Sequence, residues 1–258
     1  MKTFCFTVDD NIRFLKELTC GEFVSIFDHP YMAMYKRLHD RFGLKVQLNL
    51  FDRTEGFDLS QMTARFKEQW QENAHWLKLS FHSDVENQWP YTHAPYEEVF
   101  RDCAKVQERI LRFASKASLA ETTTVHYCSM TCDGVRALQH NGVKGLLGLF
   151  GDDEHPLTSY ALSEKAACEI RSGKILRQDG MAFAPIDLVI NTVSAEEGQG
   201  RLRKLLHRDH IWIMIHEQYF YKDYFAYQPD FEEKVAAMVS MLREEGYESL
   251  FFEELLAP

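Results

Sequence analysis

The sequence contains no long apolar run, no CxxC pair, no low-complexity tract and no excess of positive charge. A membrane-spanning helix needs roughly 20 consecutive apolar residues, and no stretch approaches that length. The net charge is −10, which disfavours nucleic acid or an anionic membrane as a partner. The chain starts with a short strand pattern, whereas a secretory leader would carry a longer uncharged run. These absences predict a cytoplasmic protein, and they leave the formation of a homo-oligomer open.

The six cysteines are scattered along the chain. In a cytoplasmic protein, cysteines within strand and helix patterns are expected to be reduced core residues. Cys128 and Cys132 lie four residues apart beside His126, a spacing that also leaves a site for a soft metal open. We favour the interpretation that these cysteines are core residues.

Strand and helix patterns alternate along the whole chain. Strands are expected at 3–8, 45–51, 76–81, 122–127, 144–149, 183–190, 211–215 and 248–252, and helices at 30–42, 60–70, 96–116, 133–141, 196–208 and 231–245. This alternation favours one domain over residues 1–258, an α/β fold that forms a single distorted (β/α) barrel of seven or eight mostly parallel strands. The segment 151–180 is less regular and is interpreted as an insertion.

Polar side chains stand at the C-terminal ends of several strand patterns. Right-handed βα crossovers make such strands run parallel, so all these ends face the same way. Active sites of parallel α/β folds lie at that end. The sequence therefore predicts one active-site mouth that gathers Asp9, Asp10, His82, His126, Tyr127, Asp187, His216 and Glu217.

Two of these positions have the spacing of metal ligands. His82 and Glu86 are four residues apart, and if a helical turn follows the strand, both side chains lie on one face and can bind one cation. Imidazole and carboxylate ligands suit zinc or a similar divalent ion, and Asp10 would supply the third ligand. Three protein ligands leave the fourth position of a catalytic zinc to water. His93 is an alternative third ligand.

The motifs, in this order, resemble those of the polysaccharide deacetylase family, the carbohydrate esterases related to the nodulation deacetylase. The family's first motif, Thr-Phe-Asp-Asp, corresponds to Thr7-Val8-Asp9-Asp10. Its second motif, His-Ser/Thr-x-x-His, corresponds to the segment from His82 to Glu86. A late motif, apolar-x-x-His, corresponds to the segment from Ile213 to His216. The resemblance covers nearly the whole chain.

The resemblance implies hydrolysis of an N- or O-acetyl group on a sugar. Asp9 would be the general base, and His216 would be the general acid that protonates the leaving amine. Asp10 and His82 would bind a divalent metal, with zinc expected and Mn²⁺, Fe²⁺ or Co²⁺ as alternatives. Water activated by the metal would attack the acetyl carbonyl. The expected substrate is a small molecule or a soluble oligosaccharide.

The chain departs from the family at several positions. Glu86 replaces the second histidine ligand. Ligation by Asp, His and Glu formally cancels the charge of a divalent ion, which lowers its Lewis acidity and favours harder ions. The family's Arg-x-Pro segment is not visible, and His126 and Tyr127 stand roughly in its place, where we expect them to contact the substrate. Asp187 is the candidate for the family's later aspartate.

An aromatic segment follows His216, with six aromatic side chains within residues 219–227. Such a segment beside an active-site mouth can stack on sugar rings or anchor an interface. We therefore place Glu217, Tyr219 and Trp89 at the substrate-binding wall. The alternative is that this segment only covers the end of the barrel.

Two other functions stay open at this point. The first is a non-catalytic carbohydrate-binding descendant of the fold whose metal is weakened or lost. The second is a metal-independent glycoside hydrolase, which needs two carboxyl groups about 5–10 Å apart across the pocket. Metal content separates the deacetylase from the binding protein, and release of acetate or of reducing sugar separates the two hydrolases.

Overall fold

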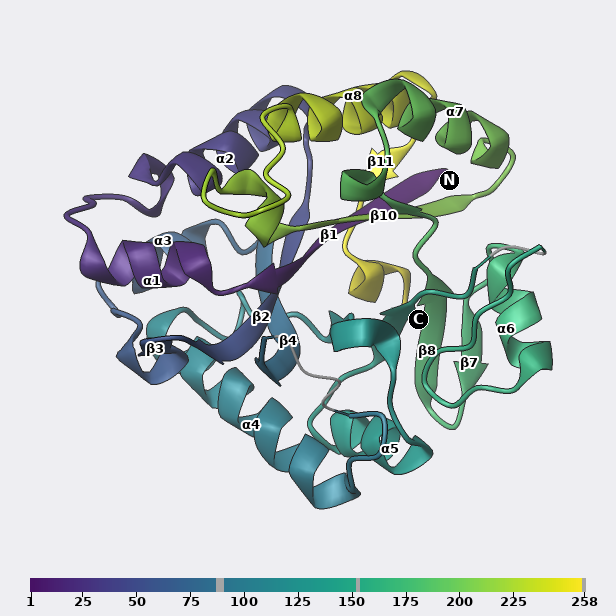
Figure 1. Cartoon of the computed structure of the whole chain (residues 1–258), viewed down its shortest axis with the longest axis horizontal. Helices are drawn as coiled ribbons and strands as arrows, with labels where there is room; N and C mark the ends of the chain where they lie inside the picture. Colours follow the sequence, from purple (N-terminus) through teal and green to yellow (C-terminus); the bar gives the residue numbers. More distant parts are fainter. Residues whose placement is uncertain (87–90, 152–153, 257–258) are drawn as a thin grey trace.

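Parallel strands form the centre of the molecule, as seen in the computed structural model in Figure 1, which describes residues 1–86, 91–151 and 154–256. The larger sheet has seven strands, and β4, β2, β1 and β10 lie side by side in that order. Its members are β1 (Thr3–Asn11), β2 (Val46–Thr54), β3 (Phe57–Asp58), β4 (Leu77–Val85), β9 (Leu188–Val189), β10 (His210–His216) and β11 (Glu248–Ser249). All pairs are parallel except the short β2–β3 hairpin.

A second sheet of four strands has the order β5-β6-β8-β7, with the last pair antiparallel. Its members are β5 (Thr122–Thr123), β6 (Gly145–Gly148), β7 (Leu176–Gln178) and β8 (Met181–Pro185). An isolated bridge from Leu79 to Leu119 links β4 to the segment before β5, and the Asp187 amide donates to the Trp212 carbonyl at 2.8 Å. The two sheets therefore meet where β4 lies beside the segment before β5, and residues 186–187 carry the chain from β8 in one sheet to β9 in the other.

The predicted α/β fold with parallel strands is confirmed, but the predicted barrel is not seen as a closed ring. Among the residues that the structure describes, the hydrogen-bonded ladders end at β4 and β9 in one sheet and at β5 and β7 in the other. β5 and β9 have only two residues each, so they cannot form long ladders. Pro185 also ends β8, because proline has no backbone N–H to donate.

Helices surround the strands, with α2, α7 and α8 along the top of Figure 1 and α4 and α5 along the bottom. Covered on both faces, β1 is buried at all nine positions, which explains why its apolar residues Phe4, Cys5, Phe6 and Val8 do not alternate strictly with polar ones. No helix in the described part of the chain is both long and apolar enough to cross a bilayer. The helices are α1 (Arg13–Cys20), α2 (Pro30–Phe42), α3 (Lys67–Glu72), α4 (Tyr96–Phe113), α5 (Cys132–His140), α6 (Glu164–Arg171), α7 (Ala195–Leu205) and α8 (Phe231–Glu244).

The main differences from the predicted elements lie near strand ends. β4 continues through Val85, so no helical turn follows His82. The strand predicted at 122–127 ends at Thr123, and residues 126–128 form the 3-10 turn η3 (His126–Cys128). The helix predicted from Ser60 is replaced by a 3-10 turn and by α3, which begins only at Lys67. The irregular segment 151–180 contains α6 and the hairpin strand β7.

Candidate metal centre

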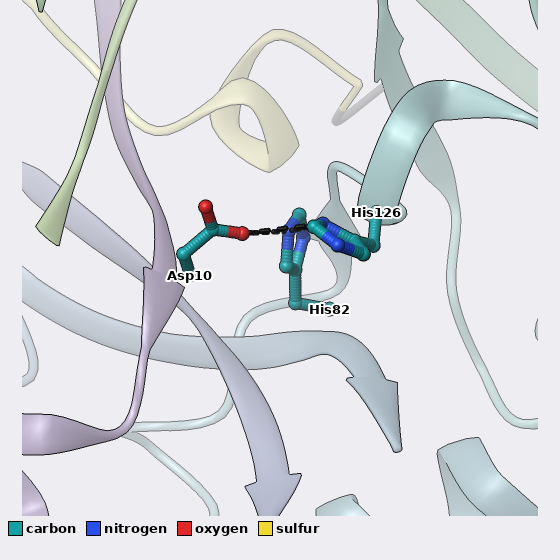
Figure 2. A group of neighbouring side chains, drawn as sticks. All are labelled: Asp10, His82 and His126. Atoms are coloured by element: carbon teal, nitrogen blue, oxygen red, sulfur yellow. Dashed lines mark hydrogen bonds and ion pairs between the residues drawn. The ribbon is translucent and has the colours of Figure 1, made fainter. Parts of the chain in front are cut away.

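Three side chains converge at the C-terminal ends of the parallel strands (Figure 2). Asp10 Oδ1 lies 3.0 Å from His82 Nε2 and 3.2 Å from His126 Nδ1, and the two nitrogens are 3.2 Å apart. With zinc–ligand bonds of 2.0–2.1 Å, neighbouring ligand atoms of a tetrahedron are about 3.3 Å apart. The spacing of these three atoms therefore fits one small divalent cation and leaves one ligand position open.

Asp10 reaches this point because the backbone of β1 bends there. Asp10 has φ of 64°, and the pairing of β1 with β2 shifts register between Val8 and Asn11. The Asn11 side chain closes the bend by donating to the carbonyls of Val8 at 2.6 Å and Asn49 at 3.2 Å. A left-handed aspartate must be held by its surroundings, and such positions cluster at functional sites.

His82 is oriented by its second ring nitrogen. Its Nδ1 donates to the Thr124 backbone carbonyl, which leaves Nε2 to face Asp10. Metal-binding histidines are commonly fixed by such a bond. Burial disfavours the charged ring, but the carboxylates of Asp9 and Asp10 raise the pKa of His82 above its ordinary value. Burial likewise opposes ionisation of Asp10, yet its bonds to the two histidines hold the Asp10 pKa well below its ordinary value.

His126 enters the group from η3, a turn with two consecutive left-handed residues, Tyr127 (φ 61°) and Cys128 (φ 53°). Burial, aided by the nearby His82 ring, lowers the pKa of His126 although Asp10 opposes this shift. The neutral imidazole is the form that binds a metal. The Phe51 ring packs edge-on against His126, with ring centroids 4.9 Å apart, and helps to hold its ring in place.

The structure does not bring Glu86 into this group. Because β4 is extended through Val85, His82 and Glu86 are separated by strand spacing, roughly 13 Å over four residues, and not by one helical turn. The Glu86 carboxylate instead lies 3.4 Å from Thr54 Oγ1. His93 is exposed on a neighbouring segment. His126, expected at the substrate wall, takes the ligand position, so an Asp-His-His set would leave a divalent ion with a net charge of +1.

Asp9 and His216 flank this group from neighbouring strands, where they are direct partners in the β1–β10 register. Asp9 is buried, and its Oδ1 accepts a hydrogen bond from Asn49 Nδ2 at 2.6 Å. Burial raises the pKa of Asp9, although His82, His216 and the bond from Asn49 act in the opposite direction. His216 Nδ1 donates to Asn191 Oδ1 at 2.9 Å, which leaves Nε2 as the ring nitrogen available for proton transfer.

Two of the predicted substrate contacts are engaged elsewhere. Asp187 accepts from Arg208 Nη1 at 2.6 Å and from the Trp212 amide at 2.9 Å, and burial raises its pKa to about 6. Asp187 therefore contacts β10 at Trp212, four residues before His216. The side chain that contacts His216 is that of Asn191. Glu217 is fully buried under the site, and Trp89 lies outside the described residues.

A cavity of about 450 Å³ opens above the three converging side chains. The predicted wall residues Tyr127 and Tyr219 both line it. A neighbouring cavity of about 690 Å³ shares three of its lining residues, so the two cavities lie side by side and we call them together the groove. The complete lining of the first cavity is Asp10, Glu86, His126, Tyr127, His216, Gln218, Tyr219, Tyr224 and Phe225.

Several residues of the site were not predicted, namely Asn49, Asn191 and Gln218. Asn49 carried a signal, because an amide on a buried strand needs a hydrogen-bond partner inside the molecule. Gln218 stands two residues after His216, so its nearness to the site was foreseeable but its contact was not. Asn191 lies in a 3-10 turn after β9 and gave no signal that we recognise.

No family model matches the sequence, and no curated protein matches it by sequence. Solved structures do match its fold. A CE4 family pseudoenzyme from Bacillus anthracis superposes with a TM-score of 0.54 at 11% identity, over 99% of this chain and 66% of its own. A family 4 acetyl xylan esterase from Clostridium thermocellum, in complex with a cobalt ion, gives 0.52 at 13% identity over 99% and 90%.

A 4-alpha-glucanotransferase from Thermococcus litoralis is also similar, with a TM-score of 0.61 at 12% identity, over 99% of this chain and 40% of its own. The chain thus spans about two thirds of the length of the pseudoenzyme and less than half of the glucanotransferase. At these identities the likeness concerns the fold. On that level it confirms the resemblance seen in the motifs: the chain has the fold of the CE4 family, whose solved members include both deacetylating enzymes and a pseudoenzyme.

Proposed function

We propose that this protein is a metal-dependent hydrolase that removes an acetyl group from a sugar or a related amide. The observation that carries the proposal is the convergence of Asp10, His82 and His126 at ligand spacing, with Asp9 and His216 on the adjacent strands. Acid–base hydrolysis of an amide needs a polarised carbonyl, a base for water and an acid for the leaving group. The described residues offer a candidate for each part.

Asp10, His82 and His126 would hold the divalent ion, for which we keep zinc as the first candidate and Mn²⁺, Fe²⁺ or Co²⁺ as alternatives. Once bound, the ion would polarise the acetyl carbonyl and make water more acidic. Asp9 would accept the proton of the attacking water, a role that suits a buried carboxyl whose pKa is raised. His216, its ring oriented by Asn191, would donate a proton to the leaving nitrogen or oxygen.

The groove supports a carbohydrate substrate. Tyr127, Tyr219, Tyr224 and Phe225 line the cavity above the candidate metal centre, and aromatic side chains offer apolar faces with polar edges. The adjacent second cavity would give room for a further sugar unit. We also infer that the two sheets act as one distorted barrel, because β4 bridges to the segment before β5 and the chain passes directly from β8 into β9.

Two alternatives have one observation each in their favour. A binding protein without catalysis is favoured by the likeness to a structure described as a pseudoenzyme. A metal-independent glycoside hydrolase is favoured by the presence of Asp10 and Glu86 on the walls of one cavity. The engagement of Asp10 with two histidines argues against this second alternative, because both of its neighbours are also metal ligands by type.

The test combines metal content with product analysis. Purified protein loaded with Zn²⁺, Co²⁺ or Mn²⁺ is expected to retain one ion per chain, and the Asp10→Ala variant is expected to lose it. Asp40→Ala, on the exposed face of α2, is the matched control and should bind normally. Acetate release from N-acetylated oligosaccharides should require the ion and Asp9. A folded protein that retains none of these ions, or that releases reducing sugar without acetate, would refute the proposal.

A further inference from the structure

The two carboxylate oxygens of Asp10 have different partners. Oδ1 faces His82 and His126, whereas Oδ2 accepts a hydrogen bond from Gln218 Nε2 at 2.7 Å. The carboxylate can only accept, so the amide of Gln218 must present its nitrogen to it. The Oε1 of Gln218 is then buried without a hydrogen-bond partner in the described part of the chain. Gln218 therefore makes the hydrogen bond to Asp10 through Nε2, while its Oε1 accepts no hydrogen bond from the described residues.

The position of Gln218 is fixed by the residue before it. Gln218 belongs to η5 (Glu217–Phe220), and the buried carboxylate of Glu217 accepts from the amides of Ile12 at 2.7 Å, Arg13 at 3.1 Å and Phe14 at 2.7 Å. These three amides begin two residues after Asp10. The segment that carries Gln218 is thus fastened to the segment that carries Asp10, and their two side chains meet in a fixed register.

We infer that Gln218 is a positioning residue that restricts Asp10 to one ligand oxygen. This inference rests on the proposed function, since it assumes that Asp10, His82 and His126 bind a divalent ion. A carboxylate without such a bond can turn and offer both oxygens to a cation. With Oδ2 held by Gln218, only Oδ1 points to the histidines, and the position that water and substrate require stays open. A neutral amide achieves this without cancelling the charge of Asp10, as Lys or Arg would.

The test uses Co²⁺ as the probe, because four-coordinate Co²⁺ absorbs visible light more strongly than five- or six-coordinate Co²⁺. Affinity is measured by competition with a chelator, and the visible spectrum is recorded, for wild type, Gln218→Leu and Gln218→Asn. The Leu variant removes the amide, and the Asn variant keeps the amide but shortens its reach. Both should bind Co²⁺ about 10- to 100-fold more weakly, the range seen when a partner of a metal ligand is lost, with weaker visible bands.

Gln199→Leu is the matched control, because Gln199 is half-buried on α7 and, among the residues that the structure describes, its side chain donates only to the Ala237 carbonyl at 3.3 Å. It should have the affinity and spectrum of wild type. If wild type binds Co²⁺ and the Gln218 variants keep both affinity and spectrum, the role of Gln218 is refuted while the proposed function stands. If wild type itself binds no Co²⁺, the proposed function fails and this inference fails with it.

Discussion

At the scale of single residues, the charged groups of the site are held by neutral amides. A neutral amide orients a carboxylate or an imidazole by one hydrogen bond, but it supplies no counter-charge. The carboxylates of Asp9 and Asp10 therefore keep their negative charge for a bound cation or for proton transfer. The three pairs are Asn49 with Asp9, Asn191 with His216, and Gln218 with Asp10.

The first prediction at this scale concerns His126, the candidate for the third metal ligand. His126→Ala should lower the affinity for Zn²⁺ at least 10-fold, because it removes one of three converging atoms. Glu86→Gln should change the affinity less than about twofold, since Glu86 lies outside the group. Calorimetric titration of both variants measures the difference. The opposite result, with Glu86→Gln binding Zn²⁺ more weakly than His126→Ala, would favour the set predicted from the sequence, in which Glu86 is the third ligand.

The raised pKa of Asp9 gives the second prediction, which concerns pH. A base works in its ionised form, so activity is lost as the pH falls through the pKa of Asp9. The bond from Asn49 lowers that pKa, and Asn49→Ala removes it. The acidic limb of kcat/KM against pH should therefore move to higher pH. Asn141→Ala, at the end of α5, is the control and should keep the wild-type profile; an unmoved limb in both variants would exclude Asp9 as the base.

Part of this site could be predicted from residue types, and part could not. Asp10 and His82 stand directly at strand ends, where parallel topology brings side chains together, and the structure places them 3.0 Å apart. His126 also ends a strand pattern, but it lies in a turn whose next two residues, Tyr127 and Cys128, are both left-handed. Neither residue type favours that backbone region, so this turn could not be predicted from residue types.

At the scale of secondary structure, a buried carboxylate connects the end of β10 to the start of α1. The first amides of a helix lack partners within the helix, and Ile12, which precedes α1, has no side chain that could accept from them. Glu217 supplies the acceptor, and Tyr221 Oη also donates to it at 2.9 Å. Burial raises the pKa of Glu217 to about 7, although these hydrogen bonds oppose the shift. Glu217 therefore holds these two elements together, and it is not among the described residues that line the cavity.

The third prediction tests this connection. Glu217→Gln replaces one acceptor oxygen by an amide group that faces backbone N–H donors, so at least one donor loses its partner. The free energy of unfolding should fall by about 1–3 kcal/mol, the cost of leaving a buried hydrogen-bond donor without a partner. Urea denaturation measures it. Glu86→Gln, on the cavity wall, is the matched control and should stay within about 0.5 kcal/mol of wild type. Equal stability of all three proteins would contradict this role.

The same contact explains why α1 was not predicted. Helix starts are recognised by a capping residue next to the helix, whereas the acceptor for α1 lies 205 residues further along the chain from Ile12. The end of β4 was missed for a related reason. Ser83 and Asp84 are polar, so the apolar pattern stops at Phe81, but pairing with β2 extends the strand to Val85. Both errors come from contacts between distant segments, which a local pattern does not contain.

At the scale of the whole molecule, parallel strand direction is what the sequence predicted best. The strand patterns predict Asp9, Asp10, His82 and His216 at one end of the strands, and the pairing of Asp9 with His216 agrees with this. They do not predict how the sheets meet, because closure depends on the lengths of strands such as β5 and β9. The same limit applies to the groove, whose walls come from loops and turns between strands.

The last prediction concerns that groove and its aromatic wall. The Phe225 side chain is 91% exposed at the mouth of the cavity, where its ring contacts only the neighbouring Tyr224 among the aromatic contacts of the described residues. Phe225→Ala should therefore leave the free energy of unfolding unchanged. If the ring stacks on sugar, kcat/KM for an N-acetylated oligosaccharide should fall about 2- to 10-fold, the range that one aromatic contact supplies.

A small acetyl ester without a sugar ring separates substrate stacking from damage to the site. Phe225→Ala should hydrolyse this ester at the wild-type rate, because Phe225 lines the mouth of the cavity and would touch only the sugar. Phe100→Ala, on the outer face of α4, is the control for loss of an exposed phenylalanine, and its side chain is 37% exposed. A loss of equal size on both substrates, or none on either, would mean that this wall only covers the end of the fold.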